Sequence, residues 1–111
     1  MTELPLEISC QEFEQQRSLD DEFFLLDCRE QEEYDLVAIA GATLLPMSEL
    51  ATRVTELAGK EQQRICVYCH HGVRSARVAA WLRQQGFGRA CSLAGGIDAW
   101  ACEIEPGIVR Y

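Results

Sequence analysis

The sequence predicts an α/β fold, with a mostly parallel sheet covered by helices on both faces. Two short continuous apolar runs, FFLLD at 23–27 and ICVY at 65–68, are typical of strands that are buried on both sides. Segments with helical signals follow these runs, and strands that alternate with helices indicate a parallel sheet. A chain of 111 residues is long enough for one core, so we expect residues 1–111 to form a single domain.

The first half of the chain begins with a helix signal. Ser9 and Glu12 fit a capping box, which predicts a short helix of about two turns. After the strand at 23–27, the acidic stretch 30–36 can form a short helix. A brief strand is expected at 43–45, between Gly41 and Pro46.

The second half repeats the alternation. Ser48 is expected to cap a helix whose apolar residues share one face and which Gly59 ends. Beyond the strand at 65–68, residues 75–85 show a helical pattern. ACSLA at 90–94 predicts a third core strand, and GGIDAW begins a last short helix.

Composition and charge exclude several classes of protein. A net charge of −8 argues against nonspecific binding to nucleic acid or to anionic membranes, which needs a basic surface. The acidic N-terminal stretch 1–16 lacks the apolar region of a signal peptide, so we expect a cytoplasmic protein. In a reducing compartment, the six cysteines are expected to be free thiols.

The charges are unevenly distributed along the chain. Residues 62–97 contain five arginines and two histidines but no Asp or Glu. Cys69 lies inside this stretch, so an anion that approaches its thiol is expected to meet a favourable potential. Solvated helix faces offer an ordinary alternative explanation.

Polar residues follow three of the expected strands. They are Asp27-Cys28-Arg29, Cys69-His70-His71 and the Gly95-Gly96 turn. Ligands of such sheets bind beyond the carboxyl ends of the strands. We therefore expect these three strand ends to form the walls of one site, in which Asp27 fixes the turn by hydrogen bonding.

The loop CHHGVRS at 69–75 combines a thiol with features that favour an anion. A tight turn between a strand and a helix directs backbone N–H groups inward, and Gly72 permits a positive φ or a close backbone approach. These amides, the helix dipole and Arg74 favour the thiolate of Cys69, which is the nucleophilic form. The loop therefore predicts a nucleophile and a cradle for an anionic adduct.

Cys69 has four other interpretations. A disulfide with Cys66 is disfavoured because an extended strand separates the two residues by about 10 Å. A zinc site with Cys66, His70 and His71 lacks a second pair of ligands at the usual spacing. An inert cysteine would favour apolar neighbours. A cysteine phosphatase needs five residues between Cys and Arg, and here four separate Cys69 from Arg74.

Three segments resemble the rhodanese family of sulfurtransferases. DCREQEEYDLVAIAGATLLPMSEL at 27–50 resembles its first signature, VYCHHGVRSARVAAWL at 67–82 its active loop and following helix, and LAGGIDAW at 93–100 its closing element. The resemblance spans roughly residues 6–105. One departure is Ala38, where the family often has histidine, and this weakens the assignment to a subgroup more than it weakens activity.

The resemblance implies a rhodanese-like sheet of about five strands and a sulfurtransferase mechanism without metal or cofactor. The Cys69 thiolate would take a sulfur atom from an anionic donor such as thiosulfate, and the persulfide would pass it to a thiol, to cyanide or to a sulfur-carrying protein. A persulfide relay between proteins and a non-catalytic interaction module remain alternatives. The expected donor-binding residues are Arg29, His70, His71, Gly72, Val73 and Arg74.

Several of these residues also have structural interpretations. Arg29 resembles the arginine of the family's Asp-x-Arg element, but pairing with Glu33 is nearly as well supported. Arg74 could pair with an acid elsewhere, and His70 and His71 could simply be exposed. Cys28 follows a strand end beside the expected site; a resolving role is one interpretation and a small apolar residue is the other. The other four cysteines are expected to serve packing: Cys10, Cys66, Cys91 and Cys102.

Overall fold

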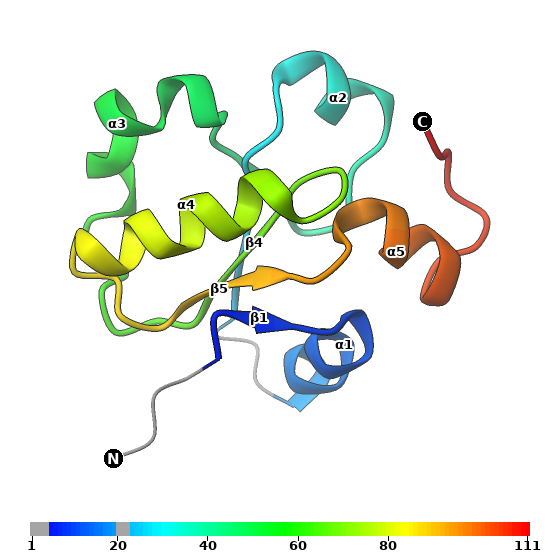
Figure 1. Cartoon of the computed structure of the whole chain (residues 1–111), viewed down its shortest axis with the longest axis horizontal. Coiled ribbons are helices and arrows are strands. Elements are labelled where there is room, and N and C mark those ends of the chain that lie inside the picture. Colours follow the sequence, from blue (N-terminus) through cyan, green and yellow to red (C-terminus); the bar gives the residue numbers. More distant parts are fainter. Residues whose placement is uncertain (1–4, 20–22) are drawn as a thin grey trace.

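The computed structural model describes residues 5–19 and 23–111, and their strands form one five-stranded sheet (Figure 1). The strand order is β1-β5-β4-β2-β3, and every neighbouring pair is parallel, which confirms the predicted α/β architecture. Residues 1–4 of the N-terminal stretch lie outside the described residues. The strands are β1 (Glu7–Ile8), β2 (Phe24–Asp27), β3 (Thr43–Leu44), β4 (Ile65–Tyr68) and β5 (Ala90–Leu93).

Helices cover both faces of the sheet, with α3 and α4 on one side and α1 and α5 on the other (Figure 1). Side chains alternate between the faces along a strand. Val67 of β4 therefore packs beneath α4, whereas Cys66 packs toward α1 and α5. The helix bounds are α1 (Cys10–Leu19), α2 (Gln31–Leu36), α3 (Leu50–Arg53), α4 (Val73–Gln84) and α5 (Gly96–Glu103).

The capping box at the start of α1 is confirmed. The Ser9 hydroxyl accepts a hydrogen bond from the Glu12 amide at 3.1 Å, and the Glu12 carboxylate accepts one from the Ser9 amide at 3.1 Å. The helix is longer than the two turns expected: it spans 10 residues, and Cys10 and Phe13 are its buried residues. A second box, formed by Glu30 and Glu33, starts α2.

The helix expected after Ser48 is broken into three short pieces. Two 3₁₀ segments, Met47–Glu49 and Val54–Leu57, flank the four residues of α3. Ser48 does not cap this region; its hydroxyl donates to the Glu30 carboxylate at 2.7 Å. The prediction of a continuous helix was wrong because its apolar spacing is satisfied by short turns that still bury Leu50 and Leu57.

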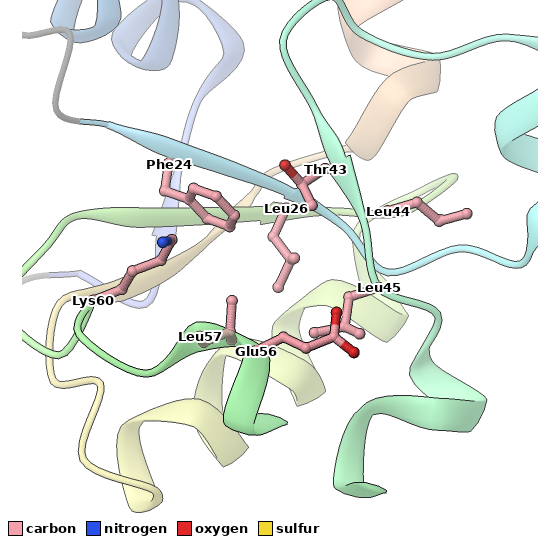
Figure 2. Close-up of a pocket in the computed structure, with 8 residues that line it drawn as sticks. All are labelled: Phe24, Leu26, Thr43, Leu44, Leu45, Glu56, Leu57 and Lys60. Atoms are coloured by element: carbon pink, nitrogen blue, oxygen red, sulfur yellow. The ribbon is translucent and has the colours of Figure 1, made fainter. Parts of the chain in front are cut away.

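A pocket of about 180 Å³ lies beside β2 and β3 (Figure 2). Apolar side chains form most of its lining, and the charged side chains of Glu56 and Lys60 also border it. None of its lining residues comes from the loop that carries Cys69. Among the described residues, no helix is both long enough and apolar enough to cross a membrane.

Candidate active site

The loop that carries Cys69 lies at the carboxyl edge of the sheet, where three strand ends meet as predicted. The first amides of α5 hold this loop, because Ile97 N donates to Cys69 O at 2.9 Å and Asp98 N donates to His70 O at 3.1 Å. Gly96 allows this approach: its φ is +61°, and a Cβ there would collide with the carbonyls of Cys69 and His70. The Gly95-Gly96 turn is therefore a wall of the site.

The loop directs three donors at the Cys69 sulfur. Gly72 N donates to Sγ at 3.1 Å, Ser75 N donates to it at 3.3 Å, and the Ser75 hydroxyl lies 3.4 Å away. Gly72 is the N-cap of α4 and has φ +98°, which confirms the positive φ expected there. Helix α4 begins at Val73, two residues earlier than predicted, so the donors belong to its first turn.

Cys69 is held as a thiolate at neutral pH. Its pKa is lowered to about 4, chiefly by a hydrogen bond from the Cys28 thiol and further by Ser75 and Gly72, although burial opposes the shift. The pKa of Cys28 is raised, because its proton is held by the Cys69 sulfur and because its thiol is buried. Sequence reasoning expected Arg74 and the amides to do this work; the largest contribution comes from Cys28.

Two serines form a hydroxyl chain behind the thiolate. The Ser75 and Ser92 hydroxyls lie 2.7 Å apart, and both side chains are buried. Ser92 can donate to Ser75 while Ser75 donates to the Cys69 sulfur. Sequence reasoning assigned neither serine to the site. Two features of the sequence could have indicated them: Ser92 is a serine within a buried strand, and Ser75 places a hydroxyl in the first helical turn after the loop.

Arg74 lies at the rim of the site, bound by an acid from another segment. Its guanidinium forms two hydrogen bonds to the Glu33 carboxylate, at 2.8 and 2.9 Å. This pairing lowers the pKa of Glu33 to about 2. The Tyr111 hydroxyl also donates to Glu33, at 2.7 Å. Although residues 62–97 contain no acid, the fold thus brings one from α2 to the site.

Arg29 lies inside the protein, where its side chain is fully buried. It forms an ion pair with Asp27 at 2.7 Å, and its remaining donors bond to the Val37 carbonyl, the Glu33 carbonyl and the Tyr111 hydroxyl. Asp27 also accepts from the Arg29 amide at 2.9 Å, so the expected strand-end turn is confirmed. Arg29 thereby connects the end of β2 to the segments that contain Glu33, Val37 and Tyr111.

The two histidines lie on the outer side of the loop. The His70 ring stacks on Tyr111 with centroids 3.8 Å apart, and its Nε2 has no hydrogen-bond partner within the described parts of the chain. His71 is exposed, and its Nδ1 lies 3.9 Å from the Asp98 carboxylate. The Val73 side chain is 65% exposed, so this residue contributes to the open rim.

A second pair of thiols lies on the other face of the sheet. Cys66 and Cys91 are partners in the register of β4 and β5, and both are fully buried. All six cysteines are free, and Cys66 packs in a different cluster from Cys69, which agrees with the argument against a disulfide between those two. Within residues 5–19 and 23–111, no three potential metal ligands gather at one point.

The chain belongs to the rhodanese-like domain family, which matches residues 9–103. It is 44% identical over 88 residues to a probable adenylyltransferase/sulfurtransferase, MoeZ, of Mycobacterium tuberculosis, covering 78% of this chain and 22% of that protein. It is 41% identical over 76 residues to the thiosulfate sulfurtransferase GlpE of Coxiella burnetii, covering 68% and 69%. The chain thus spans about a fifth of the length of the first of these relatives.

A solved structure agrees with this assignment. The crystal structure of a rhodanese-related protein from Thermoplasma volcanium superimposes with a TM-score of 0.78 at 28% identity. The match covers 95% of this chain and 96% of that one. The rhodanese fold expected from the sequence is therefore confirmed.

Proposed function

We propose that the protein is a sulfurtransferase that takes sulfane sulfur from thiosulfate and carries it as a persulfide on Cys69. The observation that carries the proposal is a buried sulfur that accepts hydrogen bonds from Gly72 N and Ser75 N and whose pKa the Cys28 thiol lowers further. These donors keep Cys69 ionised at neutral pH, and the thiolate is the nucleophilic form of cysteine.

The first half-reaction transfers one sulfur atom. The Cys69 thiolate attacks the outer sulfur of thiosulfate, the S–S bond of the donor breaks, and sulfite leaves with the electron pair. The persulfide that remains is acidic, and the loop amides that stabilise the thiolate also stabilise its anion. The donors are already in position in the free protein, so the step needs little reorganisation.

The second half-reaction regenerates the thiolate. A thiol or cyanide attacks the outer sulfur of the persulfide, and Cys69 leaves as the anion that the loop stabilises. Because the two half-reactions share a covalent intermediate, steady-state kinetics should be ping-pong. A sulfur-carrying protein would be an acceptor of the same chemical class.

The donor reaches Cys69 from the loop's rim. Arg74, His70 and His71 supply the polar side chains there, and Arg74 is the cation suited to the donor's oxygens. To contact thiosulfate, its guanidinium has to share or release Glu33, to which it is doubly bonded. The Coxiella relative, named as a thiosulfate sulfurtransferase, supports the choice of donor. Arg29 acts as a positioning residue in this scheme, through its pair with Asp27.

Mass spectrometry of the intact protein tests the proposal. After brief treatment with thiosulfate, the wild type should gain about 32 Da, while Cys69→Ser should gain nothing. Cys91→Ser is the matched control, since it removes a buried thiol on the other face and should gain the same mass. A Cys69→Ser protein that still gained the adduct would refute the assignment.

A thiosulfate–cyanide assay distinguishes the proposal from its alternatives. Sustained thiocyanate formation supports a thiosulfate sulfurtransferase. Persulfide without turnover favours a relay between proteins, and absence of any adduct favours an interaction module.

A further inference from the structure

Cys28 is a second sulfur beside the nucleophile, and the mechanism above uses it only to stabilise the thiolate. Its thiol makes the largest contribution to the lowered pKa of Cys69. Both residues belong to the cluster under α3 and α4, so their side chains point to the same face of the sheet. The fold therefore places the Cys28 thiol next to the Cys69 sulfur.

The register of the sheet brings these two cysteines within disulfide distance. Asp27 of β2 and Tyr68 of β4 are Cα partners, and Cys28 N donates to Tyr68 O at 3.1 Å, which continues the ladder by one residue. Cys28 and Cys69 thus follow a paired position on adjacent parallel strands, where Cα atoms lie about 5 Å apart. A disulfide accepts Cα separations of about 4.4–6.8 Å.

We propose that Cys28 is a resolving thiol, which discharges the Cys69 persulfide as sulfide and leaves a Cys28–Cys69 disulfide. The inference rests on the proposed persulfide and gives the site a second outcome, reductive release of sulfide from the sulfur donor. An external dithiol reductant would then restore both thiols for another cycle.

The step balances without an added oxidant. The Cys28 sulfur attacks Sγ of Cys69, a new S–S bond forms, and the bond from Sγ to the outer sulfur breaks. The outer sulfur, which carries the negative charge of the persulfide, leaves with the electron pair and takes up the Cys28 proton, so the product is one hydrosulfide ion. Cys28 is oxidised, and the transferred sulfur is reduced.

The surroundings of Cys28 favour this step only once sulfur is loaded. In the resting protein the neighbouring thiolate holds the Cys28 proton, which raises the pKa of Cys28 and keeps it unreactive. In the persulfide, Sγ is a neutral bridging sulfur, so that restraint on the Cys28 proton is lost. Cys28 is also 0% exposed, so external thiols reach it poorly, whereas its neighbour needs no access through solvent.

The competing fate of the persulfide is transfer to an external acceptor. Excess cyanide should divert the sulfur to thiocyanate and reduce the yield of disulfide. The two outcomes share the first half-reaction, and the ratio between them depends on acceptor concentration.

The experiment treats the wild type and Cys28→Ser with one equivalent of thiosulfate, anaerobically and without reductant. Serine keeps a hydrogen-bond donor beside Cys69 but cannot form a disulfide. We expect the wild type first to gain about 32 Da and then, on prolonged incubation, to release about one sulfide per chain and to end about 2 Da lighter than the reduced protein. Cys28→Ser should keep the gain of about 32 Da and release at least about tenfold less sulfide.

Peptide mapping under non-reducing conditions locates the bond in the wild type itself, so the test does not depend on the variant's folding. A tryptic peptide that contains Cys28 should be linked to the one that contains Cys69. That second peptide, 65–74, also contains Cys66, so fragment ions that separate the two sulfurs assign the link. Cys66→Ser is the matched control and should behave as the wild type.

Failure of this inference is distinguishable from failure of the proposed function. Sulfite release with a stable persulfide in both proteins, and no Cys28–Cys69 link, would overturn the resolving role and leave the sulfurtransferase proposal intact. Absence of both sulfite and adduct would contradict the proposed function. A loss of about 2 Da without thiosulfate would mark ordinary oxidation and also count against the inference.

Discussion

The protein contains two pairs of buried thiols in adjacent parts of the sheet, and only one pair lies in the proposed active site. Cys28 and Cys69 lie just beyond the carboxyl ends of β2 and β4, whereas Cys66 and Cys91 lie within β4 and β5 on the other face. Backbone amides within strands are committed to the sheet ladder. Beyond the strand end they are free to turn toward a sulfur, and the loop exploits this at Cys69.

The Cys66–Cys91 pair shows what proximity of two thiols achieves without such amides. A hydrogen bond from Cys66 lowers the pKa of Cys91, and the Arg64 guanidinium, which donates at 3.8 Å, adds to this. Burial raises the pKa of Cys66. A neighbouring thiol and an arginine are thus enough to shift the pKa of a buried cysteine. An anion-binding site also needs the turn at a strand end, which directs backbone amides at the sulfur.

Substitution of Cys69 or of Cys91, one sulfur from each pair, gives the largest expected difference in turnover. Cys69→Ser should lower thiosulfate–cyanide turnover by on the order of 10³-fold or more, because no covalent intermediate can form. Cys91→Ser should leave turnover within about twofold and cost about 1 kcal/mol of unfolding free energy. Steady-state kinetics and denaturant titration measure both; equal losses of turnover would contradict the distinction between the pairs.

The next largest effect is expected at Gly96, the glycine that lets α5 approach the Cys69 loop, and it concerns the free energy of unfolding. Gly96→Ala combines a positive φ with a collision against the Cys69 and His70 carbonyls, and we expect it to lower the free energy of unfolding by about 3 kcal/mol. Gly41→Ala is the matched control, because it shares the positive φ but meets nothing within 4 Å. It should cost about 1 kcal/mol. Equal losses in denaturant titrations would show that the close approach is unimportant.

The Ser75 hydroxyl tests how the thiolate is stabilised. Ser75→Ala removes one donor to Cys69 but keeps the backbone amide, and we expect the pKa of Cys69 to rise from about 4 by about one unit. Because the thiolate exists above its pKa, persulfide formation should be unchanged at pH 7 and reduced near pH 5. Rates measured at both values check this; a loss at pH 7 as large as that near pH 5 contradicts it. Ser92→Ala, which acts only through Ser75, should shift the profile less.

The smallest expected effect concerns the rim. Glu33→Gln weakens the grip on Arg74, so its guanidinium becomes more available to an anionic donor. We expect the KM for thiosulfate to fall by about two- to threefold at low salt, with kcat unchanged. Arg74→Gln should raise the KM. An unchanged KM in both variants would show that Arg74 serves structure alone.

The sequence predicts the sheet well and locates the loop that carries the proposed nucleophile, because both signals are local. FFLLD and ICVY are continuous apolar runs, and the loop at 69–75 places a thiol, a glycine and an arginine within seven residues. Strand β1 was missed because it has only two residues and is defined by pairing with Ser92 and Leu93, far along the chain.

The rest of the site depends on contacts between distant segments. That Cys28 lies beside Cys69 on one face of the sheet follows from the register of β2 and β4, which a single sequence does not reveal. The same is true of Glu33, which reaches Arg74 from α2, and of Ser92, which meets Ser75 across the core. The sequence contains each of these residues, but it does not indicate which distant residue each one contacts.

The proposed chemistry depends above all on the ionisation of Cys69. Ultraviolet absorbance of the thiolate, recorded against pH for the wild type and for Cys69→Ser, shows in the acidic range the transition that belongs to Cys69. We expect a difference curve with its midpoint near pH 4. A midpoint near the ordinary cysteine value of about 8.5 would contradict it.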